Sequence, residues 1–187
     1  PQALKHKDKQ IHLNVDFYQA DLARVQAMMQ NYDDSEILLI GRRHVRSNNS
    51  WLHNSHRLVK GKPRCTLMLH PDTAAQYGIE DGQDVKVTSR VGSVIVAAEI
   101  TDELMAGVVS IPHGFGHGRK GVKQKIAQAH AGISLNDLTD DALIDQLSGN
   151  AAVNGVPVQL EAMHAEAAES DSWDSSSHLK AESGSAA

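Results

Sequence analysis

Residues 37–61 read ILLIGRRHVRSNNSWLHNSHRLVKG, and this stretch decides the fold and the function that we expect. Its first four residues, Ile37 to Ile40, form an apolar run that is typical of a buried strand. From Gly41 onward the side chains become polar, with arginines and asparagines that donate hydrogen bonds. Guanidinium groups suit phosphate oxygens, and Asn amides both donate and accept, which suits the edge of a heterocycle. A strand that leads directly into such a loop predicts a site for a large, polar, anionic ligand. The alternative is a solvated basic loop with one buried tryptophan, because loops are commonly polar without a special function.

Composition limits the classes of protein that need to be considered. The chain has 187 residues, of which 41% are hydrophobic and only 4% aromatic, so we expect one globular domain with an aliphatic core. The net charge of −5 and the pI of about 6.1 argue against a general nucleic-acid or membrane-surface binder. Basic residues nevertheless gather between Ser35 and Arg64, and acidic residues dominate from Glu161 onward. A local basic patch on an acidic chain suits a specific anion better than a polyanion.

Cysteine usage and hydropathy add further limits. The single cysteine, Cys65, excludes a disulfide framework and an iron–sulfur cluster held by four thiolates of this chain. No apolar run approaches the length of a membrane span, and Pro1 begins no signal peptide. We therefore expect a cytoplasmic protein. Because the chain reads as a fragment of a longer protein, a periplasmic location stays open.

The hydrophobic pattern predicts a mainly β fold. An amphipathic helix is expected from Asp16 to about Asn31, a short helix from Pro71 to about Gly78, and another from Asp141 to Gln146. Short apolar or alternating runs predict strands at residues 11–15, 37–40, 65–69, 85–88, 94–100, 108–111 and 156–160. Strands of this length, with turns every eight to twelve residues, are typical of a small β-barrel or sandwich. The short connections argue against a doubly wound parallel sheet.

Two further polar segments follow apolar runs. Residues 112–118 read PHGFGHG, in which glycines let the backbone approach a ligand closely. His113 and His117 lie four residues apart, but the glycines argue against the helix that would turn this spacing into a metal site. Residues 133–140 read ISLNDLTD, where Asn136 stands between two leucines and needs fixed hydrogen-bond partners if it is partly buried.

Four segments taken together carry a resemblance to a known family. They are GRRHVRSNNSWLHN, HPDTAAQYGIEDGQDVKVTSRVG, GVVSIPHGFGH, and NDLTDD followed by LSGNAAVNGVPV. This set resembles the C-terminal molybdopterin-dinucleotide-binding domain of molybdenum oxidoreductases, over roughly Ser35 to Glu161. Among these enzymes, the chain is most similar to formate dehydrogenase-like anaerobic dehydrogenases. The resemblance implies a six-stranded double-psi β-barrel with short peripheral helices. It also implies molybdopterin guanine dinucleotide as the cofactor.

The resemblance also implies which residues contact the cofactor. Arg42 and Arg46 are expected at phosphate or pterin groups, and Asn48 as a hydrogen-bonding partner. Asn154 stands where the family often has a lysine, which removes a positive charge from that position. No catalytic residue and no protein ligand to the metal is expected in this chain. The complete set of expected cofactor-binding residues is Arg42, Arg43, Arg46, Ser47, Asn48, Trp51, His53, Asn54, His113, Asn136 and Asn154.

We expect three regions: an N-terminal extension with one helix (residues 1–34), the cofactor-binding barrel (35–161), and a flexible acidic tail (162–187). The resemblance implies separate N-terminal domains that carry the cysteine cluster and the metal ligand. The chain would then be a monomeric cofactor-binding domain that is inactive alone and contacts neither nucleic acid nor membrane. One alternative is a double-psi barrel interaction module that binds an acidic peptide or another anion. A hydrolase using Ser50 and His53 is a third possibility, but no nucleophile elbow supports it.

Overall fold

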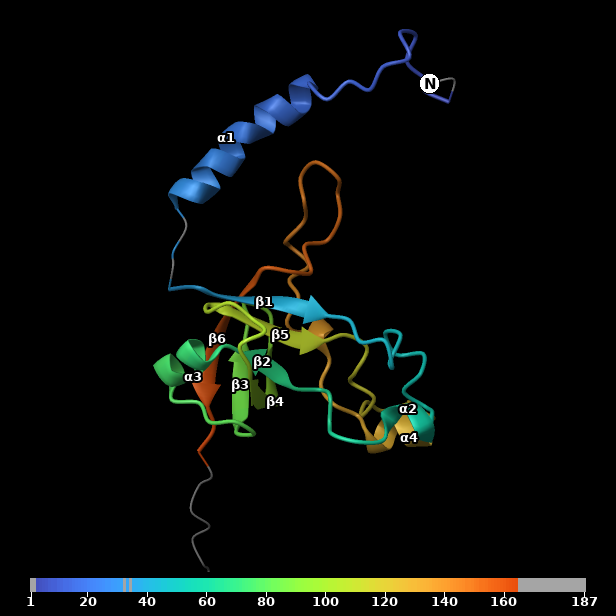
Figure 1. Ribbon diagram of the computed structural model, residues 1–187, viewed down its shortest axis with the longest axis vertical. Coiled ribbons are helices and arrows are strands. Elements are labelled where there is room, and N and C mark those ends of the chain that lie inside the picture. The colour runs from blue at the N-terminus through green and yellow to red at the C-terminus, as the bar shows by residue number, and fades with distance from the viewer. Residues whose placement is uncertain (1–2, 32, 34, 165–187) are drawn as a thin grey trace, which may run out of the picture.

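The computed structural model describes residues 3–31, 33 and 35–164. Six strands close into a barrel in the order β1-β5-β2-β4-β3-β6, which confirms the predicted mainly β barrel (Figure 1). Most of the acidic tail expected at residues 162–187 lies outside the described residues. The strands are β1 (Ile37–Arg42), β2 (Leu67–Leu69), β3 (Asp84–Thr88), β4 (Ser93–Ile100), β5 (Val108–Pro112) and β6 (Val156–Ala162).

The barrel interior is filled by the alternating aliphatic residues that the sequence pattern indicated. Successive side chains of a strand point to opposite faces, so every second residue enters the core. Burying a Leu, Val or Ile side chain contributes about 1.5–3 kcal/mol, and this set supplies most of the driving force for closure. The largest fully buried apolar side chains are Leu39, Leu67, Leu69, Val85, Val87, Val109, Ile111, Leu138 and Val156.

The pairing of β1 with β5 places two distant loops next to each other. The two strands run parallel, in register from Leu38 opposite Val108 to Arg42 opposite Pro112. Their carboxyl ends therefore lie at the same edge of the barrel, and the chain leaves both strands there. The backbone N–H of His113 donates to the carbonyl of Arg42 at 3.1 Å, so the two exits begin side by side.

In the part of the chain that the structure describes, one helix of 15 residues and four short helical segments surround or leave the barrel. The sequence located α3 well, because Pro71 occupies its first turn and Gly78 ends it at φ 63° in the left-handed region that glycine favours. In Figure 1, α2 and α4 lie beside each other next to the loop that follows β1. The helices are α1 (Asp16–Gln30), α2 (His56–Val59), α3 (Pro71–Tyr77), α4 (Lys125–Ala129) and the 3₁₀ turn η1 (Leu135–Asp137). Among the described helices, none combines the length and apolarity needed to cross a bilayer.

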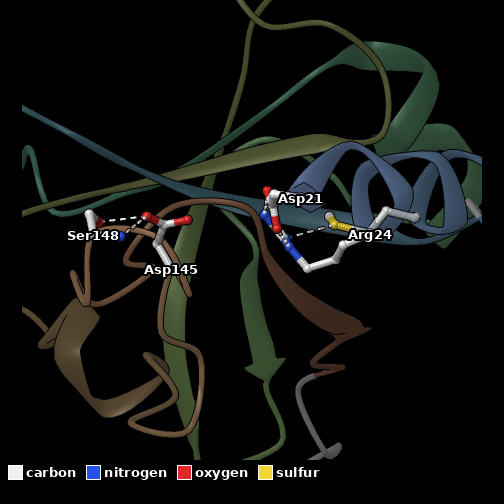
Figure 2. Close-up of polar contacts among 5 residues, drawn as sticks. Asp21, Arg24, Asp145 and Ser148 are labelled. Atoms are coloured by element: carbon white, nitrogen blue, oxygen red, sulfur yellow. Dashed lines mark hydrogen bonds and ion pairs between the residues drawn. The ribbon is translucent and has the colours of Figure 1, made fainter. Parts of the chain in front are cut away.

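Helix α1 projects away from the barrel and buries none of its residues (Figure 1). Figure 2 shows its Asp21–Arg24 ion pair, with Nε to Oδ1 at 2.6 Å, near the excursion that carries Asp145 and Ser148. The Asp145 carboxylate accepts hydrogen bonds from the Ser148 amide at 2.9 Å and hydroxyl at 2.6 Å. These two bonds, with a smaller attraction from Arg24, hold the pKa of Asp145 below its usual range.

Two predicted elements are wrong. Residues 11–15 form no strand; Ile11 and Leu13 are exposed, and no strand in the described part of the chain pairs with them. Residues 141–146 form no helix either. Asp140 accepts from the Ala142 amide at 2.8 Å, and the chain then makes a narrow excursion with an isolated bridge between Ile144 and Ala151. Asp side chains that bind nearby backbone N–H groups compete with helix formation in this way.

Candidate functional site

Three loops enclose a polar hollow at the carboxyl ends of β1 and β5. They are the first loop (residues 43–55), the second loop (113–124) and the third loop (130–137). The volume of the polar hollow is about 360 Å³, within the range of about 300–1,000 Å³ common for small-molecule sites. Its lining combines a guanidinium, amides, hydroxyls and imidazoles. The lining residues are Arg43, Asn49, Ser50, His113, Gly114, Phe115, His117, Ser134, Leu135 and Asn136.

Close backbone packing holds the first two loops together. A Cβ on Gly41 would overlap the imidazole of His113, reaching 2.8 Å from its Cδ2 atom. Gly114 adopts φ 90°, and a Cβ there would collide with the backbone of Asn49 and lie 2.8 Å from the Ser50 nitrogen. Both positions require glycine, the second also because L-residues avoid this φ region. The glycines thus let the second loop lie directly on the first.

A hydrogen-bonded histidine pair also connects these two loops. His53 Nδ1 lies 2.8 Å from His117 Nε2, and the two rings meet edge to face. The His53 ring is 3% exposed and also packs on Phe115, at a centroid distance of 4.3 Å. Burial, and then the charge of His117, lowers the pKa of His53, so this imidazole stays neutral at neutral pH.

The third loop joins the second through backbone hydrogen bonds. The N–H groups of Gly116 and His117 both donate to the carbonyl of Ala131, at 2.8 and 3.1 Å. The 3₁₀ turn η1 then presents Asn136 at the rim of the polar hollow, while Leu135 is buried behind it. Three loops that are distant in the sequence therefore converge on one hollow.

Three of the expected cofactor-binding residues, Arg43, His113 and Asn136, line the polar hollow together. Arg43 carries the permanent positive charge of the lining. Burial, followed by the charge of Arg43, holds the pKa of His113 below its ordinary value. The hollow thus offers one cationic donor beside a neutral imidazole and an amide.

Three other expected residues lie on the outer surface of the first loop. Arg46 and Asn48 are exposed, and Trp51 is 83% exposed. Asn48 has φ 42°, a left-handed conformation that Asn tolerates better than most residues. It turns the loop so that the following residues, Asn49 and Ser50, enter the lining. The cofactor contacts expected of Arg46, Asn48 and Trp51 stay predictions.

The Arg42 side chain stabilises the barrel through internal hydrogen bonds. Its guanidinium donates to the carbonyl of Ser110, to the carbonyl of Arg64 at 3.2 Å and to Thr66 Oγ1 at 2.7 Å. These acceptors belong to β5 and to the segment that enters β2, so Arg42 links three parts of the chain. Arg42 does not line the polar hollow. Its expected phosphate or pterin contact stays a prediction, which must compete with these internal hydrogen bonds.

Asn154, Asn54 and Ser47 also bind backbone groups. Asn154 Oδ1 accepts from the Gly41 N–H at 2.8 Å, at the point where the first loop begins. Asn54 Oδ1 accepts from the first-turn amides of α4, those of residues 126 and 127, at 3.2 and 3.3 Å. Ser47, 3% exposed, donates to the carbonyl of His44 at 2.9 Å. These polar side chains position the loops, and their direct contacts with a cofactor stay predictions.

Sequence reasoning missed several lining residues. Asn49 and Ser50 directly follow Asn48, and a turn at Asn48 would have predicted their inward direction. His117 was considered only as a metal ligand, whereas its ring nitrogen pairs with His53. Among the described residues, no group of three or more His, Cys, Asp or Glu side chains is arranged to hold a metal ion. Ser50 and His53 make no side-chain hydrogen bond to each other, because the His53 ring turns to His117.

A second, larger hollow lies near the amino end of β1. Its volume is about 840 Å³, and we call it the apolar hollow because its walls are mostly aliphatic and aromatic carbon. Arg90 and the buried Asp140 form an ion pair in its wall. Hydrogen bonds from Arg90 and from the Ala142 amide lower the pKa of Asp140 to about 2. The charged groups of this ion pair thus neutralise each other within the wall.

Comparison with known proteins gives a family match over most of the barrel. Residues 37–157 match the family model described as "Molydopterin dinucleotide binding domain". The chain is 30% identical over 122 residues to a tetrathionate reductase subunit of Salmonella typhimurium. It is 45% identical over 47 residues to the alpha subunit of F420-dependent formate dehydrogenase 1 of Methanococcus maripaludis. The match covers 56% of this chain and 12% of the first relative, and 25% of this chain and 7% of the second.

A solved structure shows the same fold. Acetylene hydratase from Pelobacter acetylenicus superposes with a TM-score of 0.58 over 82% of this chain and 21% of that chain, at 19% identity. The family match and the relatives confirm the resemblance that the loop sequences indicated, and with it the cofactor class. The chain spans only a small part of its relatives, which contain further regions beyond the one that it matches.

Proposed function

Because this chain belongs to the molybdopterin dinucleotide-binding domain family, we propose that it is the cofactor-binding part of a formate dehydrogenase-like molybdenum oxidoreductase. Its own task is to hold and orient molybdopterin guanine dinucleotide. The observation that carries this proposal is the polar hollow, in which Arg43, His113 and Asn136 converge from three loops. Rigid loops on a closed barrel supply the pre-organisation that such binding needs.

The residues of the polar hollow fit this cofactor. The Arg43 guanidinium suits a pyrophosphate oxygen, and the amides of Asn49 and Asn136 suit the edge of guanine or pterin. Gly114 lines the hollow without a side chain, which allows a ligand to approach the backbone there. The lining residues of the hollow would hold one part of the dinucleotide, and the exposed Arg46 of the first loop would be available to another phosphate or pterin group.

Residues of this chain bind, orient and desolvate the cofactor. The bound cofactor supplies the redox chemistry at molybdenum, which its dithiolene sulfurs hold. No residue of this chain is assigned to the metal. We propose that the protein ligand to molybdenum and the iron–sulfur relay belong to further domains of the same protein. The small share of each relative that this chain covers supports this assignment.

The choice of formate dehydrogenase over the reductases rests on sequence likeness in the loops. The formate dehydrogenase relative has 45% identity over 47 residues, against 30% over 122 residues for the tetrathionate reductase relative. Sequence identity is higher in the shorter match, whereas the longer match covers more of this chain. An assay of the protein with its further domains decides between them: formate oxidation with an artificial acceptor supports the proposal, whereas tetrathionate reduction alone contradicts the formate assignment.

Cofactor binding itself is tested on the 187-residue chain by two-dimensional NMR. Guanosine 5′-diphosphate and 6-hydroxymethylpterin are the probes, each titrated separately. We expect amide shifts in the first, second and third loops, centred on Arg43, His113 and Asn136. Shifts confined to the apolar hollow would contradict the proposed site. Shifts of the first loop with an acidic peptide, and none with either probe, would favour a peptide-binding module instead.

A further inference from the structure

The hydrogen bond between His53 and His117 constrains the protons of both rings. His53 Nδ1 and His117 Nε2 are 2.8 Å apart, and with both rings neutral one nitrogen must carry the proton while the other accepts it. Two arrangements satisfy this bond. In the first, His53 donates from Nδ1, which leaves its Nε2 bare. In the second, His117 donates from Nε2, which leaves its Nδ1 bare.

The surroundings of His53 Nε2 favour the second arrangement. This atom is buried, and within the described part of the chain no group completes a hydrogen bond to it. The backbone of Gly114 faces the ring and acts to raise the pKa of His53, as a carbonyl acceptor does when it stabilises a proton on the ring. A proton on Nε2 has this backbone group as a neighbour, whereas a bare Nε2 would be desolvated without any donor among the described residues. This difference favours the arrangement in which His53 carries its proton on Nε2 and accepts at Nδ1.

The second arrangement leaves a free acceptor in the polar hollow. His117 lines the hollow, and its Nε2 is occupied by the bond to His53, so Nδ1 is the ring nitrogen that remains for a ligand. Without a proton, Nδ1 accepts a hydrogen bond. Guanine and pterin share a 2-amino-4-oxo edge, on which a ring N–H and an amino group donate side by side. A fixed acceptor complements that edge, as Arg43 complements a phosphate.

We propose that His53 is a positioning residue that fixes the tautomer of His117, so that His117 Nδ1 accepts an N–H from the 2-amino-4-oxo edge of the bound cofactor. The proposal rests on the proposed function, which supplies the ligand class. It gives a role to the polar ring of His53, a residue that is only 3% exposed, in the contact between the first and second loops.

The first test needs no ligand, so its outcome is separate from that of the proposed function. Long-range ¹H–¹⁵N correlation spectra of the 187-residue chain report which nitrogen of each imidazole carries the proton. We expect the Nε2–H tautomer for both His53 and His117, with a bare Nδ1 on each. A His117 ring protonated on Nδ1 overturns the proposal, whether or not any probe binds.

The second test uses a matched pair of variants, His53→Leu and His53→Asn. Asn places its side-chain oxygen near the position of Nδ1 and can accept from His117, whereas Leu cannot. For guanosine 5′-diphosphate and 6-hydroxymethylpterin, H53L is expected to lose about tenfold in affinity, the size of one hydrogen bond, and to lose the single tautomer. H53N is expected to recover most of both.

The two probes distinguish guanine from pterin as the occupant. Whichever of them responds to the variants is the heterocycle that His117 contacts. Equal losses in H53L and H53N, with the tautomer of His117 unchanged in both, would assign His53 a merely structural role and overturn the proposal. If H53L does not fold, as thermal melting would show, H53N and the tautomer of the unmodified chain still decide.

Discussion

The polar hollow and the apolar hollow differ in the chemistry of their walls as well as in their volume. The apolar hollow is more than twice as large, at about 840 Å³ against 360 Å³. Two of its charged residues, Arg90 and Asp140, are however already paired with each other. In the polar hollow, Arg43 and Asn136 instead face a shared space with their polar groups. The chemistry of the lining, rather than the volume, is therefore the reason for proposing the polar hollow as the ligand site.

The largest expected effect comes from a substitution that adds a side chain at Gly41, next to the His113 ring that lines the polar hollow. G41A adds a Cβ that overlaps the His113 ring. Overpacking costs about 1–3 kcal/mol of folding stability. Because the added Cβ also displaces the His113 ring from the lining, we expect weaker binding of guanosine 5′-diphosphate by calorimetry. G118A is the matched control, because its Cβ would meet Ala131 at an ordinary 3.6 Å. Equal effects of the two substitutions would show that the close packing at Gly41 is irrelevant to binding.

Substitutions of the adjacent residues Arg42 and Arg43 compare a structural role with a ligand-binding role. R43Q removes the cationic donor of the polar hollow and is expected to weaken probe binding about tenfold or more, with unchanged stability. R42Q removes three internal hydrogen bonds and is expected to lower the free energy of unfolding by about 1–3 kcal/mol. Denaturant unfolding and calorimetry on both variants provide the comparison. The reverse pattern would assign Arg42 to the ligand, as the sequence resemblance implied.

Asn54 offers a smaller test of how the first loop is held. Its side chain caps α4 from a distant position, and removing a capping side chain typically costs about 1 kcal/mol. N54A should lower the unfolding midpoint in urea accordingly. Ser55 stands at the N-cap of α2 without a side-chain capping bond, so S55A serves as the control. Two variants of equal stability would mean that the long-range cap contributes nothing.

The smallest expected effect is a pH-dependent change in stability caused by Asp140, in the wall of the apolar hollow. The folded-state pKa of Asp140, about 2, is below its ordinary value of 3.8 because Arg90 and the Ala142 amide donate to the carboxylate. Its stabilising contribution is therefore present above about pH 4 and disappears as the pH falls toward about 2. D140N should lower stability at neutral pH and reduce the loss of stability on acidification through this window, without affecting probe binding.

The exposed Arg119–Asp137 pair supplies a control for the last prediction. Solvent screens this pair, so D137N should change the acid dependence less than D140N does. Urea unfolding across the pH range measures both variants. A D140N profile that runs parallel to that of the unmodified chain would show that Asp140 does not contribute to acid sensitivity. Loss of probe binding in D140N would contradict the separation of the two hollows.

Much of the barrel was predictable, because the strand pattern is local. Alternation at Val85 and Val87 and the apolar run at Ile37–Ile40 each give a strand that the structure contains. The wrong predictions concern segments whose structure depends on contacts with residues distant in the sequence. Ile11 and Leu13 alternate correctly but pair with no strand among the described residues, so pattern alone was misleading. Parallel pairing of β1 with β5 carries no local signature.

The candidate site was predictable by loop but not by side-chain direction. The sequence selected His113 and Asn136, which line the polar hollow, because each follows an apolar run or interrupts one. It could not separate Arg42, the last residue of β1, from Arg43, the first residue of the loop, because the neighbours of each side chain were unknown. His53 was selected as a ligand contact, yet its ring turns to His117, a residue 64 positions away.

The hydrogen bond from the Gly41 N–H to Asn154 has a consequence for the timing of assembly. The two residues are 113 positions apart, and Asn154 shortly precedes β6, the strand that completes the barrel. Contacts of such high sequence separation form late and slowly in folding. A chain that ends before Asn154 cannot make this bond and therefore lacks one of the hydrogen bonds that fix Gly41 next to His113.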